Sequence, residues 1–137
     1  MPESRMLWGA ALSASQCEGA YAEEGKGLSI SDTVPSGRRD LTKRYPKPDS
    51  QHYYPTHNAV DFYHRYPEDI ELMAQCGLEC LRFSFAWSRF FPQGDERQPN
   101  PLAVQHYDDL IDRLLAKKIV PIVTMSHLEI PFALTEK

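Results

Sequence analysis

The chain lacks several features that would place it in whole classes of protein. No apolar run approaches the ~20 residues that a membrane-spanning helix needs. Positive charge is not in excess, because 15 Lys and Arg stand against 19 Asp and Glu, which gives a net charge of −4. No basic stripe breaks that balance. We therefore expect neither a nucleic-acid surface nor a membrane partner.

Cysteine is scarce, with only Cys17, Cys76 and Cys80. An odd number of cysteines, in a chain whose N-terminus has no signal-peptide pattern, favours a reducing, cytoplasmic setting over a disulfide scaffold. Cys76 and Cys80 have no second pair of ligand residues nearby, so we expect no metal site and interpret these two as buried free thiols. No cofactor is expected either.

What the sequence does contain is a repeated arrangement of apolar runs and polar clusters. Residues 6–11, 81–86 and 119–125 have the apolar, strand-like character of buried β-strands, and each run ends in a polar cluster. Helical patterns over about 56–76 and 101–118 separate them. This β, α, β, α, β order predicts an α/β fold with a parallel sheet, whose polar clusters meet at the C-terminal ends of the strands.

The two predicted helices differ in how clearly they begin and end. The first has an apolar stripe from Phe62 to Ala74, and Gly77 suits the position just after a helix end. Pro67 lies inside it, so either the helix kinks there or a second helix starts near Tyr66. The second has an uninterrupted amphipathic pattern. Residues 21–54 form a long, turn-rich loop beside the expected site, and we interpret its basic residues as solvated (Arg38, Arg39, Lys43, Arg44).

Three polar residues near the strand ends are candidates for a site. Arg82 lies inside the second apolar run, on the same side as Ser84, and a buried arginine needs a carboxylate partner. In a closed barrel that side can be the lumen. Gln16 and His127 follow the first and third runs. An amide can bind two adjacent sugar hydroxyls, but spacing alone equally allows a loop-capping glutamine, a core histidine and a structural ion pair for Arg82.

Three segments carry a resemblance to a known family. Residues 7–19, 82–94 and 124–131 resemble, in order and spacing, the first three strand segments of family-one glycoside hydrolases, the β-glucosidase family. Residues 53–66, together with Ser126, His127 and Glu129, are similar to the branch of bacterial 6-phospho-β-glucosidases. Leu128 departs from the pattern, because an aromatic residue is usual there.

The resemblance implies a fold and roles for individual residues. Residues 1–137 would form about three strand–helix units, the N-terminal part of a TIM (β/α)8 barrel truncated after its third strand. Gln16 and His127 would bind the non-reducing sugar. Arg82 would lie near the catalytic nucleophile and lower its pKa. Glu18 and Arg89 would be structural, and Glu129 would not be a catalytic carboxylate.

The resemblance also implies that both catalytic carboxylates lie beyond residue 137. A retaining glycosidase needs an acid/base and a nucleophile about 5–5.5 Å apart. The family's Asn-Glu-Pro and Thr-Glu-Asn-Gly motifs are absent, since Thr135 and the two residues after it match only the start of the second. We therefore expect a chain that is inactive alone, marginally stable and prone to aggregate through its open sheet edges.

Other functions stay open at this point. The expected partners are a β-glucoside or 6-phospho-β-glucoside sugar and, for a split barrel, a complementing C-terminal portion. A non-catalytic sugar-binding module is a second possibility. A flavodoxin-like binding domain is disfavoured, because no glycine-rich phosphate loop follows the first apolar run.

Overall fold

A computed structural model describes residues 5–36 and 47–135. Within them, strands β1 (Gly9–Ala11), β2 (Cys80–Ser84) and β3 (Val120–Thr124) form one parallel sheet with β2 in the middle. The register places Arg82 beside Ala11 on one neighbour and Ile122 on the other. The predicted α/β architecture is therefore confirmed, although β1 is shorter than the apolar run that predicted it.

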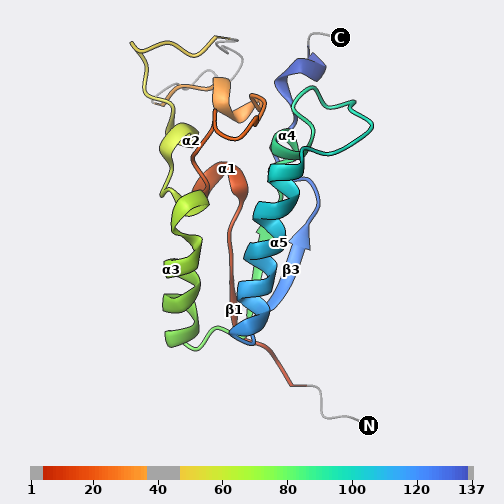
Figure 1. Ribbon diagram of the computed structural model, residues 1–137. Helices are drawn as coiled ribbons and strands as arrows, with labels where there is room; N and C mark the ends of the chain where they lie inside the picture. Colours follow the sequence, from red (N-terminus) through yellow and green to blue (C-terminus); the bar gives the residue numbers. More distant parts are fainter. Residues whose placement is uncertain (1–4, 37–46, 136–137) are drawn as a thin grey trace.

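One side of this sheet is covered by the two long helices that connect the strands, α3 (Phe62–Gln75) and α5 (Pro101–Ala116) (Figure 1). Apolar side chains from both helices and from β2 form the core. Leu81 of β2 and Leu114 of α5 are 0% exposed, and Ile70 of α3 is 1% exposed. We call this the helix-covered side of the sheet.

The opposite side of the sheet has no such cover among the described residues. Alternate strand residues point to opposite faces, and Arg82, Val120 and Ile122 are exposed where Leu81 and Phe83 are buried. The exposed fractions of Val120 and Ile122 are 46% and 47%. We call this the open side.

Short elements gather beyond the C-terminal ends of the strands. Figure 1 shows α1, α2 and α4 together there, at the end opposite the N-terminus. These short elements are α1 (Ala14–Cys17), α2 (Pro55–Asn58) and α4 (Trp87–Phe90), with the 3₁₀ turns η1 (Ser31–Thr33) and η2 (Phe132–Thr135). An antiparallel bridge between Ser29 and Pro131 joins the loop after β1 to the segment after β3.

The helix predicted over 56–76 is two helices, and the second does not start near Tyr66, as one of the alternatives for Pro67 had it. The break lies earlier, where Ala59 and Asp61 have positive φ angles of 47° and 57°, a left-handed backbone that a continuous helix cannot contain. Pro67 is accommodated inside α3. Gly77 does follow the helix as predicted, with φ 77°. α5 begins at Pro101 as predicted, and its N-cap residue Asn100 accepts a hydrogen bond from the Leu102 amide at 3.1 Å.

The interpretation of two cysteines as buried thiols is wrong. Cys76 is exposed, because it caps the end of α3, and Cys80 is only half-buried on the open side, whereas Cys17 is in the core. The described residues contain no cluster of side chains that could hold a metal ion. No helix in the described ranges is long and apolar enough to cross a membrane. The basic residues 38, 39, 43 and 44 lie outside the described residues.

Candidate functional site

The turn that carries Gln16 is held in place by its neighbours rather than by its own helix. α1 has only four residues and no side-chain cap. The end of β2 supplies one attachment, because the Ala14 amide donates to Ser84 Oγ at 2.9 Å. The Leu12 amide donates to the carbonyl of Arg82 at 2.8 Å and so continues the sheet into the turn.

A second attachment comes from the segment after β3. Glu129 is 1% exposed, and its two carboxylate oxygens accept different backbone amides. Oε1 accepts the Ser15 amide at 2.8 Å, and Oε2 accepts the Leu128 amide at 3.0 Å. One buried side chain therefore joins the turn after β1 to the turn after β3.

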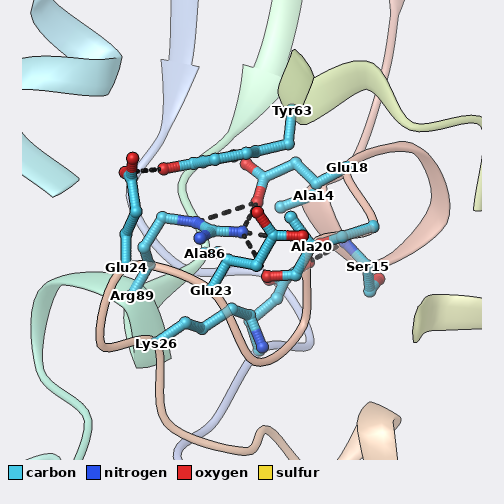
Figure 2. A network of polar contacts seen from close by, with 12 residues as sticks. Ala14, Ser15, Glu18, Ala20, Glu23, Glu24, Lys26, Tyr63, Ala86 and Arg89 are labelled. Atoms are coloured by element: carbon cyan, nitrogen blue, oxygen red, sulfur yellow. Dashed lines mark hydrogen bonds and ion pairs between the residues drawn. The ribbon is translucent and has the colours of Figure 1, made fainter. Parts of the chain in front are cut away.

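The third attachment is a buried ion pair between Glu18 and Arg89 (Figure 2). Arg89 is 0% exposed, and its Nη2 and Nε donate to Glu18 Oε2 at 3.2 and 3.4 Å. The hydroxyl of Tyr107, on α5, donates to the other carboxylate oxygen. Burial raises the pKa of Glu18, while the Arg89 guanidinium and the Tyr107 hydroxyl oppose that rise.

Arg89 makes further contacts that fix the chain after α1. Its Nη2 donates to the Ala20 carbonyl at 3.4 Å, and its guanidinium carbon lies 3.8 Å from the ring centre of Tyr63. These contacts join α1, α4, α5 and α3, as a structural role for Glu18 and Arg89 predicts. The pair thus ties α1 and α4 to both long helices.

Gln16 itself is exposed at the edge of a hollow. Ser13 Oγ donates to its Oε1 at 2.8 Å, which orients the amide. The hollow has a volume of about 680 Å³. Its lining combines Gln16 with residues of the long loop, α2 and the turn after β3 (Ser15, Ser31, Val34, Pro35, Tyr53, Pro55, Thr56, Ala59, Val60, Leu128).

His127 and Arg82 occupy two other places. His127 is exposed and lies three residues beyond the end of β3. It does not line the hollow, although its neighbour Leu128 does. The prediction of a buried Arg82 with a carboxylate partner is wrong for the described chain. Arg82 is exposed because the described residues form no second layer over the open side, and its Nε donates to Thr124 Oγ1 at 2.9 Å.

The two backbone contacts of Glu129 could not be predicted from the sequence. The resemblance marks Glu129 as part of a family-like segment and as a non-catalytic carboxylate, but nothing in a glutamate after a strand indicates that its oxygens reach an amide 114 positions away. Ser84 was likewise noted for the side of the strand it occupies, not for its bond to Ala14. Such contacts depend on the tertiary arrangement of three strand ends.

Comparison with known proteins connects this geometry to a family. The family model described as glycosyl hydrolase family 1 matches residues 1–137. A phospho-cellobiase of Klebsiella oxytoca is 50% identical over 95% of the chain and 27% of its own length. An aryl-phospho-β-D-glucosidase of Bacillus subtilis is 46% identical over 100% of the chain and 29% of its own length.

A solved structure agrees with these sequence matches. The family 1 β-glucosidase from Thermotoga maritima superimposes with a TM-score of 0.80 at 34% identity, covering 99% of this chain and 29% of that one. This match confirms the predicted fold class, part of a family-one barrel, and the chain spans between a quarter and a third of these relatives. The match along its whole length and the shared arrangement of strands together establish that the chain belongs to glycosyl hydrolase family 1.

Proposed function

We propose that this chain supplies the first three strand–helix units of a retaining 6-phospho-β-glucosidase. The observation that carries the proposal is the convergence of its three family-like segments at the C-terminal ends of β1, β2 and β3, where a barrel enzyme has its site. The names of the bacterial relatives, a phospho-cellobiase and an aryl-phospho-β-D-glucosidase, support the phosphorylated sugar as substrate.

In this proposal Gln16 and His127 bind hydroxyls of the non-reducing sugar. Both are exposed, and the Gln16 amide is oriented by Ser13 at the edge of the hollow. A glutamine that merely capped a loop would direct its amide to backbone groups. The geometry therefore favours a ligand-facing role over the alternative of a capping amide.

Arg82 has a role that depends on what covers the open side. Its Nε is occupied by Thr124, which holds the guanidinium at the sheet, and the side chain is otherwise exposed. In a closed barrel this side faces the lumen, where the nucleophile carboxylate of the remaining strands would meet it and have its pKa lowered. The missing carboxylate partner would then come from the rest of the barrel.

The chain alone is expected to be inactive, because the two catalytic glutamates would belong to later strands. We would assay a chromogenic aryl 6-phospho-β-glucoside with three samples. These are the chain alone, the chain mixed with the non-matching part of the Bacillus subtilis relative, and a chimera in which the chain replaces the matching segment of that relative. We expect hydrolysis from the chimera, weaker hydrolysis from the mixture and none from the chain alone.

A pair of glutamine variants tests the site. In the chimera, Gln16→Ala should lower kcat/KM by about 10- to 100-fold, the loss expected when polar ligand contacts are removed. Gln75→Ala, at the far end of α3, is the matched control and should change nothing. Activity of the chain alone would refute the claim that both catalytic carboxylates lie outside it. An inactive chimera that still bound the sugar would favour the non-catalytic alternative.

A further inference from the structure

Glu129 connects the two turns that carry the proposed sugar-binding residues. The Ser15 amide, bound by Oε1, immediately precedes Gln16. The Leu128 amide, bound by Oε2, immediately follows His127. One carboxylate therefore contacts the backbone next to each of the two side chains.

The segment behind Glu129 is itself fixed. The Ile30 amide donates to the Ile130 carbonyl at 2.9 Å, and the Phe132 amide donates to the Leu28 carbonyl at 2.7 Å. The backbone on the C-terminal side of Glu129 is thus paired with the loop after β1. A carboxylate on a fixed backbone sets the position of whatever it binds, so the two amides have little freedom relative to each other.

The carboxylate of Glu129 suits its position because it offers two acceptor oxygens and no donor. Both partners of Glu129 are N–H donors, so both of its oxygens must accept. No ion pair with Glu129 is formed among the described residues, where its partners are these two amides. The two charge-assisted hydrogen bonds offset part of the cost of burying the carboxylate.

We propose that Glu129 is a positioning residue that sets the separation of Gln16 and His127 to that of the hydroxyls of one sugar ring. The proposal rests on the proposed function, because it takes these two residues as the sugar contacts. In this proposal Glu129 does not contact the sugar or the reacting atoms. It acts through the amides of Ser15 and Leu128.

The test is a set of variants in the chimera. Glu129→Gln keeps the size of the side chain but turns an NH₂ group toward one of the two amides, so one hydrogen bond is lost. We expect kcat/KM to fall by about 10- to 100-fold, mainly through KM. Glu129→Asp keeps both acceptors but is one methylene shorter, and should lose less than Glu129→Gln.

A double mutant separates positioning from general destabilisation. If Glu129 acts through Gln16, the pair Gln16→Ala and Glu129→Gln should lose little more than Gln16→Ala alone. The control is Ile70→Val, which destabilises the core by packing alone and should combine additively with Gln16→Ala. Additive losses for Glu129→Gln, or an unchanged kcat/KM, would overturn the proposal.

A second measurement needs no activity and so distinguishes this proposal from the proposed function. In the 137-residue chain, Glu129→Gln should speed hydrogen exchange of the Ser15 and Leu128 amides by about tenfold or more, and leave the Phe83 amide in β2 unchanged. If the chimera is inactive but this local change appears, the proposed function fails and the positioning geometry holds. Unchanged exchange at both amides would overturn the positioning role itself.

Discussion

The two sides of the sheet use the same strand in opposite ways. On the helix-covered side, Leu81 and Phe83 of β2 are buried against α3 and α5. On the open side, Arg82 of the same strand is exposed beside Ile122. The core that stabilises the described part of the chain therefore lies on the helix-covered side, whereas the open side exposes Arg82 and Ile122.

The two arginines of the second family-like segment offer the largest test of this contrast. Arg89→Met would leave the Glu18 carboxylate buried without its cation, which costs about 3–5 kcal/mol. Arg82→Met removes an exposed side chain and should change stability by less than about 0.5 kcal/mol. Urea unfolding followed by circular dichroism measures both. Equal losses would show that the open side is covered in solution.

A similar contrast should hold for apolar residues. Leu81→Ala on the covered side creates a cavity in the core and should cost about 2–5 kcal/mol of unfolding free energy. Ile122→Ala on the open side, where the side chain is 47% exposed, should cost less than about 1 kcal/mol. If the Ile122 variant lost as much as the Leu81 variant while also reducing self-association, the open side would be a contact between copies of the chain.

The helix-covered side should also carry the pH dependence. His106 of α5 stacks on Tyr63 of α3 at 4.0 Å, and burial, with the nearby Arg89, lowers its pKa from 6.5 to about 4. Between these two pH values His106 therefore binds more protons in the unfolded chain than in the folded one. Its contribution to stability is full above pH 6.5 and should fall by roughly 2–3 kcal/mol toward pH 4.

The matched variant for this prediction is His106→Gln. It should flatten the fall in unfolding free energy between pH 6.5 and pH 4, measured by urea unfolding at several pH values. His64, which is exposed, works in the other direction, because Asp61 raises its pKa and its contribution is lost as the pH rises. If His106→Gln left the fall in unfolding free energy unchanged, the acid sensitivity would belong to another group.

The smallest effect concerns the thiols and leaves stability unchanged. Burial raises the pKa of the Cys17 thiol to about 12, so little reactive thiolate forms on the covered side. Iodoacetamide should label exposed Cys76 first, half-buried Cys80 more slowly, and Cys17 only on unfolding. Mass spectrometry of the labelled peptides gives the order. Early labelling of Cys17 would mean that the helices leave the sheet easily.

Much of the fold could be predicted from local sequence patterns, because the spacing of apolar residues reflects which face of a strand or helix is buried. Alternating polarity placed Arg82 and Ser84 on one side of β2, and amphipathic spacing predicted a helix over about 101–118, within which α5 runs from Pro101 to Ala116. The break between α2 and α3 was not predicted, since the left-handed backbone of Ala59 and Asp61 does not follow from their residue types alone. That break reflects tertiary packing, where the Tyr63 amide donates to the Glu18 carbonyl at 3.0 Å.

The position of the candidate site could be predicted from the sequence, but the hydrogen bonds and ion pair that hold its turns could not. Gln16 and His127 were identified from family-like segments, and both are exposed beyond the strand ends. Their roles stay predictions until the variants are measured. The prediction that Arg82 is buried was wrong, because an apolar strand suggests two covered faces and the described residues cover one. The bonds made by Glu129 join residues distant in sequence, and no periodic pattern encodes them.

The three attachments of the Gln16 turn also constrain when that turn can form. Ser84, Arg89 and Glu129 lie 70, 71 and 114 positions from their partners Ala14, Glu18 and Ser15. Each attachment must close a long loop, which slows folding. During synthesis, a nascent chain that has reached Arg89 can make the first two, but the turn waits for a further 40 residues before Glu129 completes it. The Gln16 turn, although it is encoded first, should be among the last parts to become ordered.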